Sequence, residues 1–211
     1  AGAGSYRYYS VETGTLNGTN YALAVGDDGT SNGYVAYTTT GSSWTMVTQG
    51  TLNYPLYSVI YGDNRFLAVG NLNSVSTTSN GFFRLFYTTN QGVFTNTTAQ
   101  IGNNFSVNNL GGGTYAFGQF IIMNFSSVST TGTYASANPL LGQSRIYTSP
   151  DGFTWTMRPV PAMPYTRGKL AFANGILAYV NSSIPETSTI CTTAYNKTAW
   201  HITNTALTTI N

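Results

Sequence analysis

The chain has 211 residues, of which only 7% are charged, and its formal net charge is +2. An average soluble domain carries about 25% charged residues. The longest apolar runs, such as 120–123 and 175–180, are far shorter than the roughly 20 residues of a spanning helix. The sequence has no basic run of the kind that binds nucleic acid or anionic lipid. With 41% hydrophobic residues the chain can fill a core, and we expect one all-β domain over residues 1–211.

The chain begins with Ala1-Gly2-Ala3-Gly4, without Met or an apolar leader, which is typical of a piece excised from a longer polypeptide. Cys191 is the only cysteine and His201 the only histidine, which excludes an intrachain disulfide and a multi-cysteine zinc site. Asp27-Asp28-Gly29 lacks the ligand spacing of a calcium loop, although Ca²⁺ stays an open alternative there. We expect no cofactor.

One pattern recurs four times along the chain, at intervals of roughly 50 residues. An apolar phrase resembling Leu-Ala-Val-Gly precedes a phrase resembling Tyr-Thr-Thr, and an aromatic residue follows. The apolar phrases span 23–26, 67–70, 121–124 and 177–180; the second phrases begin at Tyr37, Tyr87, Tyr147 and Cys191; the aromatic residues are Trp44, Phe94, Trp155 and Trp200. The pattern predicts four repeats, approximately 5–50, 51–103, 104–163 and 164–211.

Each repeat reads as four strands, which in the second unit are roughly 56–61, 65–69, 82–88 and 93–97. Pairs such as Asn17-Gly18 and Asn174-Gly175 between the first two strands supply the positive φ values of tight hairpins. Four-stranded units of this length are typical of β-propeller blades. We therefore predict a small β-propeller of about four four-stranded antiparallel blades. We favour closure within one chain, with a larger ring completed by missing sequence or by a second chain as the alternative.

The third repeat contains Ile-Tyr-Thr-Ser-Pro-Asp-Gly-Phe-Thr-Trp-Thr over residues 146–156. This stretch resembles the Asp-box, or BNR, repeat of sialidase-like propellers, with one residue fewer between Asp151 and Gly152. The other copies are degenerate and lack the aspartate. Similar blades occur in tail-fibre tips of bacteriophages and in surface-fibre adhesins of bacteria. The resemblance implies structural roles for Asp151, Thr154, Trp155, Trp44, Phe94 and Trp200, with the four aromatic residues packed between sheets.

The resemblance to sialidases would also imply an arginine triad, a Tyr–Glu nucleophile pair and an aspartic acid/base. The chain has only six acidic residues, and its arginines occupy no position that repeats from unit to unit. A glycosidase with two carboxylates could use Asp27 or Asp28 together with Glu186. The sequence favours a domain that is not an enzyme, with a sialidase-like glycoside hydrolase as the alternative.

The longest connections lie between the second and third strands of each unit, and they are rich in Asn, Ser, Thr and Tyr. Binding residues concentrate on loops of this kind, and neutral hydroxyls, amides and tyrosine rings suit sugars. The candidate ligand-binding residues are Tyr54, Tyr134 and Tyr165 for stacking, Arg158 and Arg167 for acidic groups, and Asp27, Asp28 and Glu186 for sugar hydroxyls.

These observations favour a non-catalytic receptor-binding tip or adhesin domain, with a cell-surface polysaccharide or glycoprotein as its partner. The expected location is extracellular, on a cell surface or a virion fibre. Fibres of this kind imply a homotrimer held through a shaft outside this sequence. A structural or assembly module of a fibre is the third hypothesis.

Overall fold

The computed structural model describes residues 6–29, 32–52, 55–70, 82–88, 94–100, 110–124, 145–158, 170–183, 187–195 and 200–206, with side chains described over part of these ranges. The first sheet contains β1 (Arg7–Leu16), β2 (Thr19–Asp27), β3 (Gly33–Thr38) and β4 (Thr45–Leu52). The second sheet contains β5 (Leu56–Gly62), β6 (Arg65–Gly70), β7 (Phe82–Thr88) and β8 (Phe94–Gln100). Both sheets are antiparallel meanders.

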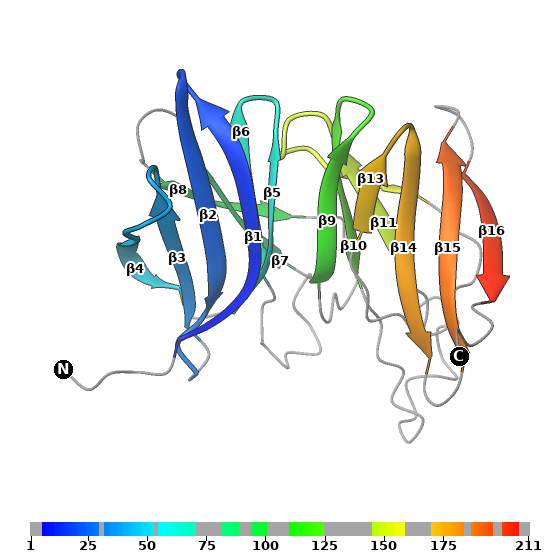
Figure 1. Cartoon of the computed structure of the whole chain (residues 1–211), viewed down its shortest axis with the longest axis horizontal. Coiled ribbons are helices and arrows are strands. Elements are labelled where there is room, and N and C mark those ends of the chain that lie inside the picture. Colours follow the sequence, from blue (N-terminus) through cyan, green and yellow to red (C-terminus); the bar gives the residue numbers. More distant parts are fainter. Residues whose placement is uncertain are drawn as a thin grey trace.

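The third sheet contains β9 (Leu110–Ala116), β10 (Gln119–Asn124), β11 (Arg145–Ser149) and β12 (Thr156–Arg158). The fourth sheet contains β13 (Leu170–Ala173), β14 (Ile176–Ser183), β15 (Thr187–Tyr195) and β16 (Trp200–Ala206). Strands β1, β5, β9 and β13, the first strands of the four sheets, lie next to one another along one edge of the row of sheets (Figure 1). We call them the inner strands. The prediction of an all-β fold of propeller type is confirmed, while the boundaries of the repeats stay a prediction.

Tight hairpins join the first two strands of each sheet because two consecutive residues there adopt positive φ. Asn17 and Gly18, with φ of 49° and 80°, form the first of these turns, and Asn174 and Gly175 form the last. This left-handed backbone matches the twist of the flanking strands. In the third sheet the turn residue is Phe117, with φ of 55°, which is rare for a bulky side chain. Its ring packs edge-on against Phe172, with ring centroids 4.8 Å apart, and this contact offsets part of the backbone cost.

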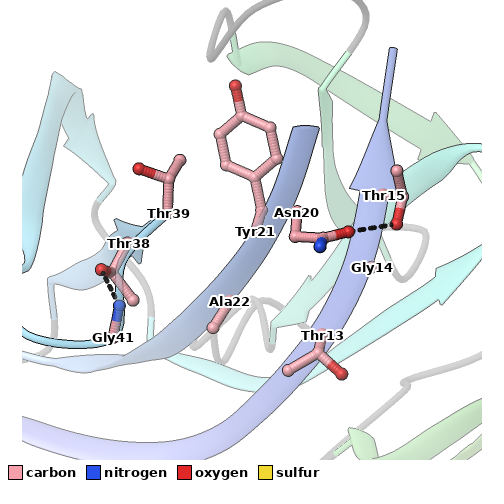
Figure 2. Close-up of a pocket in the computed structure, with 9 residues that line it drawn as sticks. All are labelled: Thr13, Gly14, Thr15, Asn20, Tyr21, Ala22, Thr38, Thr39 and Gly41. Carbon is pink, nitrogen blue, oxygen red and sulfur yellow. Dashed lines mark hydrogen bonds between the residues drawn. The ribbon is translucent and has the colours of Figure 1, made fainter. Parts of the chain in front are cut away.

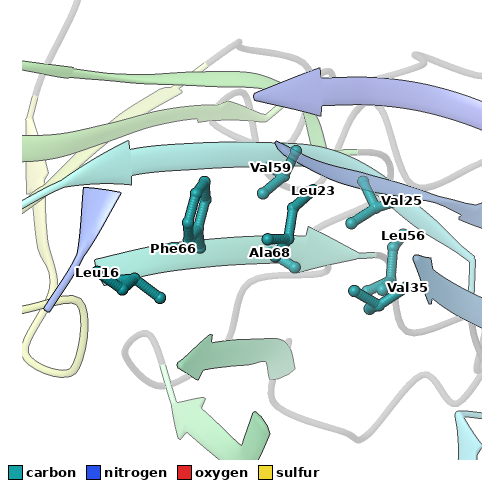
Figure 3. Close-up of a cluster of buried hydrophobic side chains, with 8 residues drawn as sticks. All are labelled: Leu16, Leu23, Val25, Val35, Leu56, Val59, Phe66 and Ala68. Atoms are coloured by element: carbon teal, nitrogen blue, oxygen red, sulfur yellow. The ribbon is translucent and has the colours of Figure 1, made fainter. Parts of the chain in front are cut away.

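Three apolar clusters hold consecutive sheets together. Between the first two sheets, Leu16, Leu23, Val25 and Val35 pack against Leu56, Val59, Phe66 and Ala68 (Figure 3). The second cluster joins Ile60, Leu67 and Val69 to Phe120, Ile122 and Tyr147, and the third joins Ala116, Ile121, Met123 and Ile146 to Leu170 and Leu177. Because side chains alternate along a strand, each middle sheet contributes one face to the preceding sheet and one to the following sheet.

An aromatic ring lies against a glycine across each of the first two interfaces. A Cβ atom on Gly14 would lie 2.2 Å from the Tyr61 ring, and one on Gly62 would lie 2.1 Å from the Tyr115 ring. The Tyr61 hydroxyl also donates a hydrogen bond to the Thr15 carbonyl at 2.5 Å. These glycines therefore leave the space that lets consecutive sheets approach.

Two phrases of the sequence repeat are displaced by one residue in the structure. In β14, Leu177 packs toward the third sheet, whereas Leu67, its counterpart in the sequence pattern, packs toward the following sheet. Tyr147 of β11 faces the preceding sheet, whereas Tyr37 of β3 faces the following one. A shift of one residue moves a strand's side chains to the opposite face, and the sequence pattern alone did not reveal it.

The described strands form an open row, and the first and fourth sheets lie at its two ends (Figure 1). Val11 on the outer face of the first sheet and Ile176 on that of the fourth are both exposed. The expectation of a ring closed by these four sheets is therefore wrong for the described strands. Apolar side chains that would be covered by closure remain at the surface.

Replacing Gly14 by Ala tests the contact between ring and glycine. The added methyl group would overlap the Tyr61 ring, and overpacking of this kind costs about 1–3 kcal/mol of unfolding free energy. Urea unfolding monitored by circular dichroism measures the loss. Thr13→Ala is the control, because Thr13 is exposed and its substitution should change the free energy by less than about 0.5 kcal/mol. Equal stability of Gly14→Ala and the unmodified chain would contradict this packing.

Candidate functional site

A β-bulge recurs near the start of the first strand in the first two sheets. The register shifts between Tyr8 and Ser10 in β1, and between Leu56 and Ser58 in β5. The extra residues are therefore Tyr9 and Tyr57. Bulges redirect side chains and are frequent beside active sites.

The glycine that ends each of the first two apolar phrases is explained by these bulges. A Cβ atom on Gly26 would lie 1.7 Å from the Arg7 carbonyl oxygen, and one on Gly70 would lie 2.5 Å from the Pro55 carbonyl oxygen. Only glycine permits the bulged strand to approach so closely.

Tyr9, Asp27 and Tyr57 form a cluster at this end of the sheets, which we call the tyrosine–aspartate cluster. The Tyr9 hydroxyl donates a hydrogen bond of 2.6 Å to Asp27 Oδ2. The rings of Tyr9 and Tyr57 lie 5.4 Å apart between centroids, tilted by 42°. Asp27 is only 6% exposed, and carboxylates are seldom so buried unless they are paired. Two sheets thus contribute to one polar group.

Asp27 and burial together raise the pKa of both phenols. The hydrogen bond to Asp27 is the largest cause of the raised pKa of Tyr9; burial adds to it, and Arg7 opposes it. Burial is the main cause of the raised pKa of Tyr57, with a further contribution from the charge of Asp27. At neutral pH the Tyr9 hydroxyl is therefore a donor held against a buried acceptor.

Asp27 and Asp28 also shape the connection between β2 and β3. Asp27 Oδ1 accepts a hydrogen bond of 2.8 Å from the Gly29 amide. Asp28 accepts bonds from the amide and the side chain of Asn32, at 3.0 and 2.7 Å. The structure thus brings Asp27 into the cluster and uses Asp28 to close the loop. Their role toward a ligand stays a prediction.

The side chains of the remaining predicted binding residues are not described, so their role stays a prediction. Arg158 ends β12, but its side chain is not described. Tyr54, Tyr134, Tyr165, Arg167 and Glu186 lie outside the described residues, as do the side chains of Phe94 and Trp200. The sequence analysis missed Tyr9 and Tyr57, although the bulge glycines Gly26 and Gly70 were visible in the repeated phrase.

The turn around Asp151 lies at the opposite end of the strands, where β11 meets β12. Asp151 Oδ1 accepts hydrogen bonds from the amides of Phe153 and Thr154, both at 2.8 Å, and from the Ser149 hydroxyl at 2.9 Å. Burial raises the pKa of Asp151, but these three hydrogen bonds outweigh it and leave the pKa below its ordinary value. Arg65 of the second sheet donates to the Asp151 carbonyl oxygen at 3.1 Å and so connects the turn to its neighbour.

The two tryptophans that follow such turns behave differently. Trp155 donates to the Gly152 carbonyl oxygen at 3.1 Å and packs against the cluster between the second and third sheets. Trp44 is 47% exposed, so the expectation that it packs between sheets is wrong. No described sheet precedes the first one, and Trp44 therefore has no surface to pack against.

A hollow of 380 Å³ lies on the first sheet, near the turn that joins β3 to β4 (Figure 2). Its lining includes Thr13, Asn20, Tyr21 and Thr39, with no charged side chain. It therefore lacks a group for acid–base chemistry. Among the described residues, no three potential metal ligands gather in one place, and no helix is long and apolar enough to cross a membrane.

No protein-family model matches the sequence, and no curated protein is similar to it. The fold is similar to solved glycoside hydrolases. A GH43_1 enzyme from Xanthomonas citri complexed with xylotriose has a TM-score of 0.55 at 8% identity, over 97% of this chain and 74% of that one. A GH43 β-xylosidase/α-arabinofuranosidase from a compost microbial metagenome has a TM-score of 0.55 at 11% identity, over 95% and 78% of the two chains.

A sialidase from Trypanosoma rangeli in complex with sialic acid has a TM-score of 0.52 at 13% identity. The match covers 95% of this chain but only 37% of the sialidase. At these identities the likeness concerns the fold alone, which is that of β-propeller enzymes. It contradicts the expectation of a domain that is not an enzyme, because the solved structures that share the fold are enzymes.

Replacing Asp151 by Asn tests the charge of the turn. Since the pKa of Asp151 is lowered from 3.8, its ionised form stabilises the fold above that pH, and this stabilisation is lost as the pH falls further. We expect Asp151→Asn to lower the unfolding free energy by about 1–2 kcal/mol at neutral pH. Urea unfolding at a series of pH values should show the difference shrinking below pH 3.8.

The control for that variant is Asp63→Asn, because the exposed pair between Asp63 and Arg65 should contribute less than about 1 kcal/mol. A difference between the Asp151→Asn and unmodified chains that stayed constant down to the acid limit would contradict the assigned role.

Proposed function

We propose that the chain is a glycoside hydrolase that cleaves its substrate at the tyrosine–aspartate cluster. The observation that carries this proposal is the 2.6 Å hydrogen bond from the Tyr9 hydroxyl to the buried carboxylate of Asp27. A phenol in contact with a buried base is an activated-nucleophile arrangement, and it combines a nucleophile with its proton acceptor. The likeness of the fold to xylosidases and sialidases supports the same reaction class.

The proposed reaction begins when Tyr9 Oη attacks the anomeric carbon of the substrate. Its proton passes to Asp27 Oδ2 while a second carboxylic acid protonates the departing glycosidic oxygen. Water then attacks the anomeric carbon of the tyrosyl–sugar bond; this water gives its proton to the second carboxylate, and Tyr9 regains its own proton from Asp27. The anomeric configuration is retained, because two inversions occur in sequence.

The second carboxyl group is proposed to be that of Asp28, which follows Asp27 directly in the connection between β2 and β3. The Tyr57 ring, tilted against that of Tyr9, offers a face on which a pyranose could stack.

The substrate we propose is a glycan of a cell-surface polysaccharide or glycoprotein, met outside the cell. The low charge of the whole chain and the resemblance to the tips of phage tail fibres and bacterial surface fibres support this location. A fibre protein that acts on surface glycans would need to recognise the glycan and to cleave it, and the proposed site would carry out the cleavage.

Hydrolysis of aryl glycosides tests the proposal, with xylosides, arabinofuranosides and sialosides as probes. We expect the chain to release aryl alcohol from at least one of them. Tyr9→Phe and Asp27→Asn should each lower kcat by at least about 100-fold, since they remove the nucleophile or its base. Tyr57→Phe keeps the ring and should retain most activity. Folded protein that hydrolyses none of the probes, or full activity of Tyr9→Phe, would refute the proposal.

A further inference from the structure

The two ends of the row of sheets expose surfaces of the kind that is buried between sheets elsewhere in the molecule. The outer face of the first sheet carries the exposed Tyr8 and Val11, the half-buried Ala22 and Met46, and the buried Ala24 and Ala36. The outer face of the fourth sheet carries the exposed Ala171, Ala173 and Ile176 and the half-buried Ala178. None of these residues is charged, and exposed apolar side chains gathered on one face mark interaction sites.

We infer that the chain associates head to tail with a second copy of itself. In this arrangement the outer face of the fourth sheet of one copy packs on the outer face of the first sheet of the next. The inference does not depend on the proposed glycosidase activity.

The first sheet offers the same surface that the second sheet uses inside the molecule. Val11 pairs with Ala24 just after the bulge of β1, and Val59 pairs with Ala68 just after the bulge of β5. Val59 is 3% exposed because the first sheet covers it, whereas Val11 is 61% exposed. The same position is therefore covered in one sheet and open in the other.

The fourth sheet offers the complementary surface. Ala171 pairs with Ala178 as Ile60 of the second sheet pairs with Leu67. Ile60 and Leu67 are buried against the third sheet, whereas Ala171 is exposed. Ile176 is 49% exposed, so an apolar side chain lies at the edge of this face.

The orientation of these faces selects a head-to-tail contact. Within the chain, each sheet packs one face on the preceding sheet and the other face on the following sheet. The fourth sheet leaves open the face that would pack on a following sheet, and the first sheet leaves open the face that would pack on a preceding one. Different ends of two copies therefore fit each other. Such heterologous contacts close into rings or extend as chains of molecules. A net charge of only +2 on the chain opposes association little.

The expected association is weaker than the contacts inside the chain. Thr13 of the first sheet occupies the position at which the second and third sheets carry Tyr61 and Tyr115, so no ring reaches across. The hollow of Figure 2 lies beside Thr13 and leaves part of this face unfilled. We therefore expect reversible association that depends on concentration.

Sedimentation velocity of the purified chain at rising concentration tests the inference. The unmodified chain should shift from 22.6 kDa toward twice that mass or more. Val11→Asp and Ile176→Asp should each raise the dissociation constant at least about tenfold, because each places a charge in the contact. Thr19→Asp, at the exposed β1–β2 turn, is the control and should associate normally. Circular dichroism checks that each variant is folded.

Mixing the two variants distinguishes a head-to-tail contact from other arrangements. The Val11→Asp copy keeps its fourth sheet intact and the Ile176→Asp copy keeps its first sheet intact, so the mixture should recover pairs that neither variant forms alone. An unmodified chain that stays monomeric would overturn the inference. If only Val11→Asp lost association, two first sheets would be in contact, which would overturn the inference. A mixture of the two variants that did not associate would also overturn it.

Discussion

The approach of consecutive sheets depends on an aromatic ring that lies against a glycine. Tyr61 occupies the space beside Gly14, and Tyr115 occupies the space beside Gly62. These contacts set the distance between sheets at one end of the inner strands. At the other end, where the strands bulge, the same spacing lets Tyr9 of the first sheet meet Tyr57 of the second. The candidate site is therefore a consequence of how the sheets pack.

Much of the fold could be predicted from the sequence because repetition and turn chemistry are local signals. Asn17-Gly18 and Asn174-Gly175 form the turns that their residue types predict. The turn at Phe117 carries no such signal, because a tertiary contact with Phe172 accompanies its backbone conformation. The pattern also did not reveal toward which neighbouring sheet Tyr147 and Leu177 point, because a shift of one residue moves a side chain to the opposite face of its sheet.

The candidate site was harder to predict than the fold. Asp27 was recognised as a candidate, but its partner Tyr9 lies on another strand, and only the register of the sheet brings them together. The bulge that redirects Tyr9 leaves a trace in the sequence as Gly26, which has the same role as Gly70. The expectation of a domain without catalysis rested on the scarcity of acidic residues and on arginines that occupy no repeating position. Scarcity says nothing about where the few carboxylates lie, and one of them is buried against a phenol.

The central claim is that Asp27 holds the Tyr9 hydroxyl in a specific hydrogen bond. NMR titration of the chain labelled with ¹³C at tyrosine Cζ measures it most directly, with Tyr9 assigned by the Tyr9→Phe variant. The account predicts a pKa of Tyr9 above the ordinary 10.0 and a lower pKa in Asp27→Asn, because the variant loses the carboxylate that causes the shift. A Tyr9 pKa that is the same in both proteins would contradict the account.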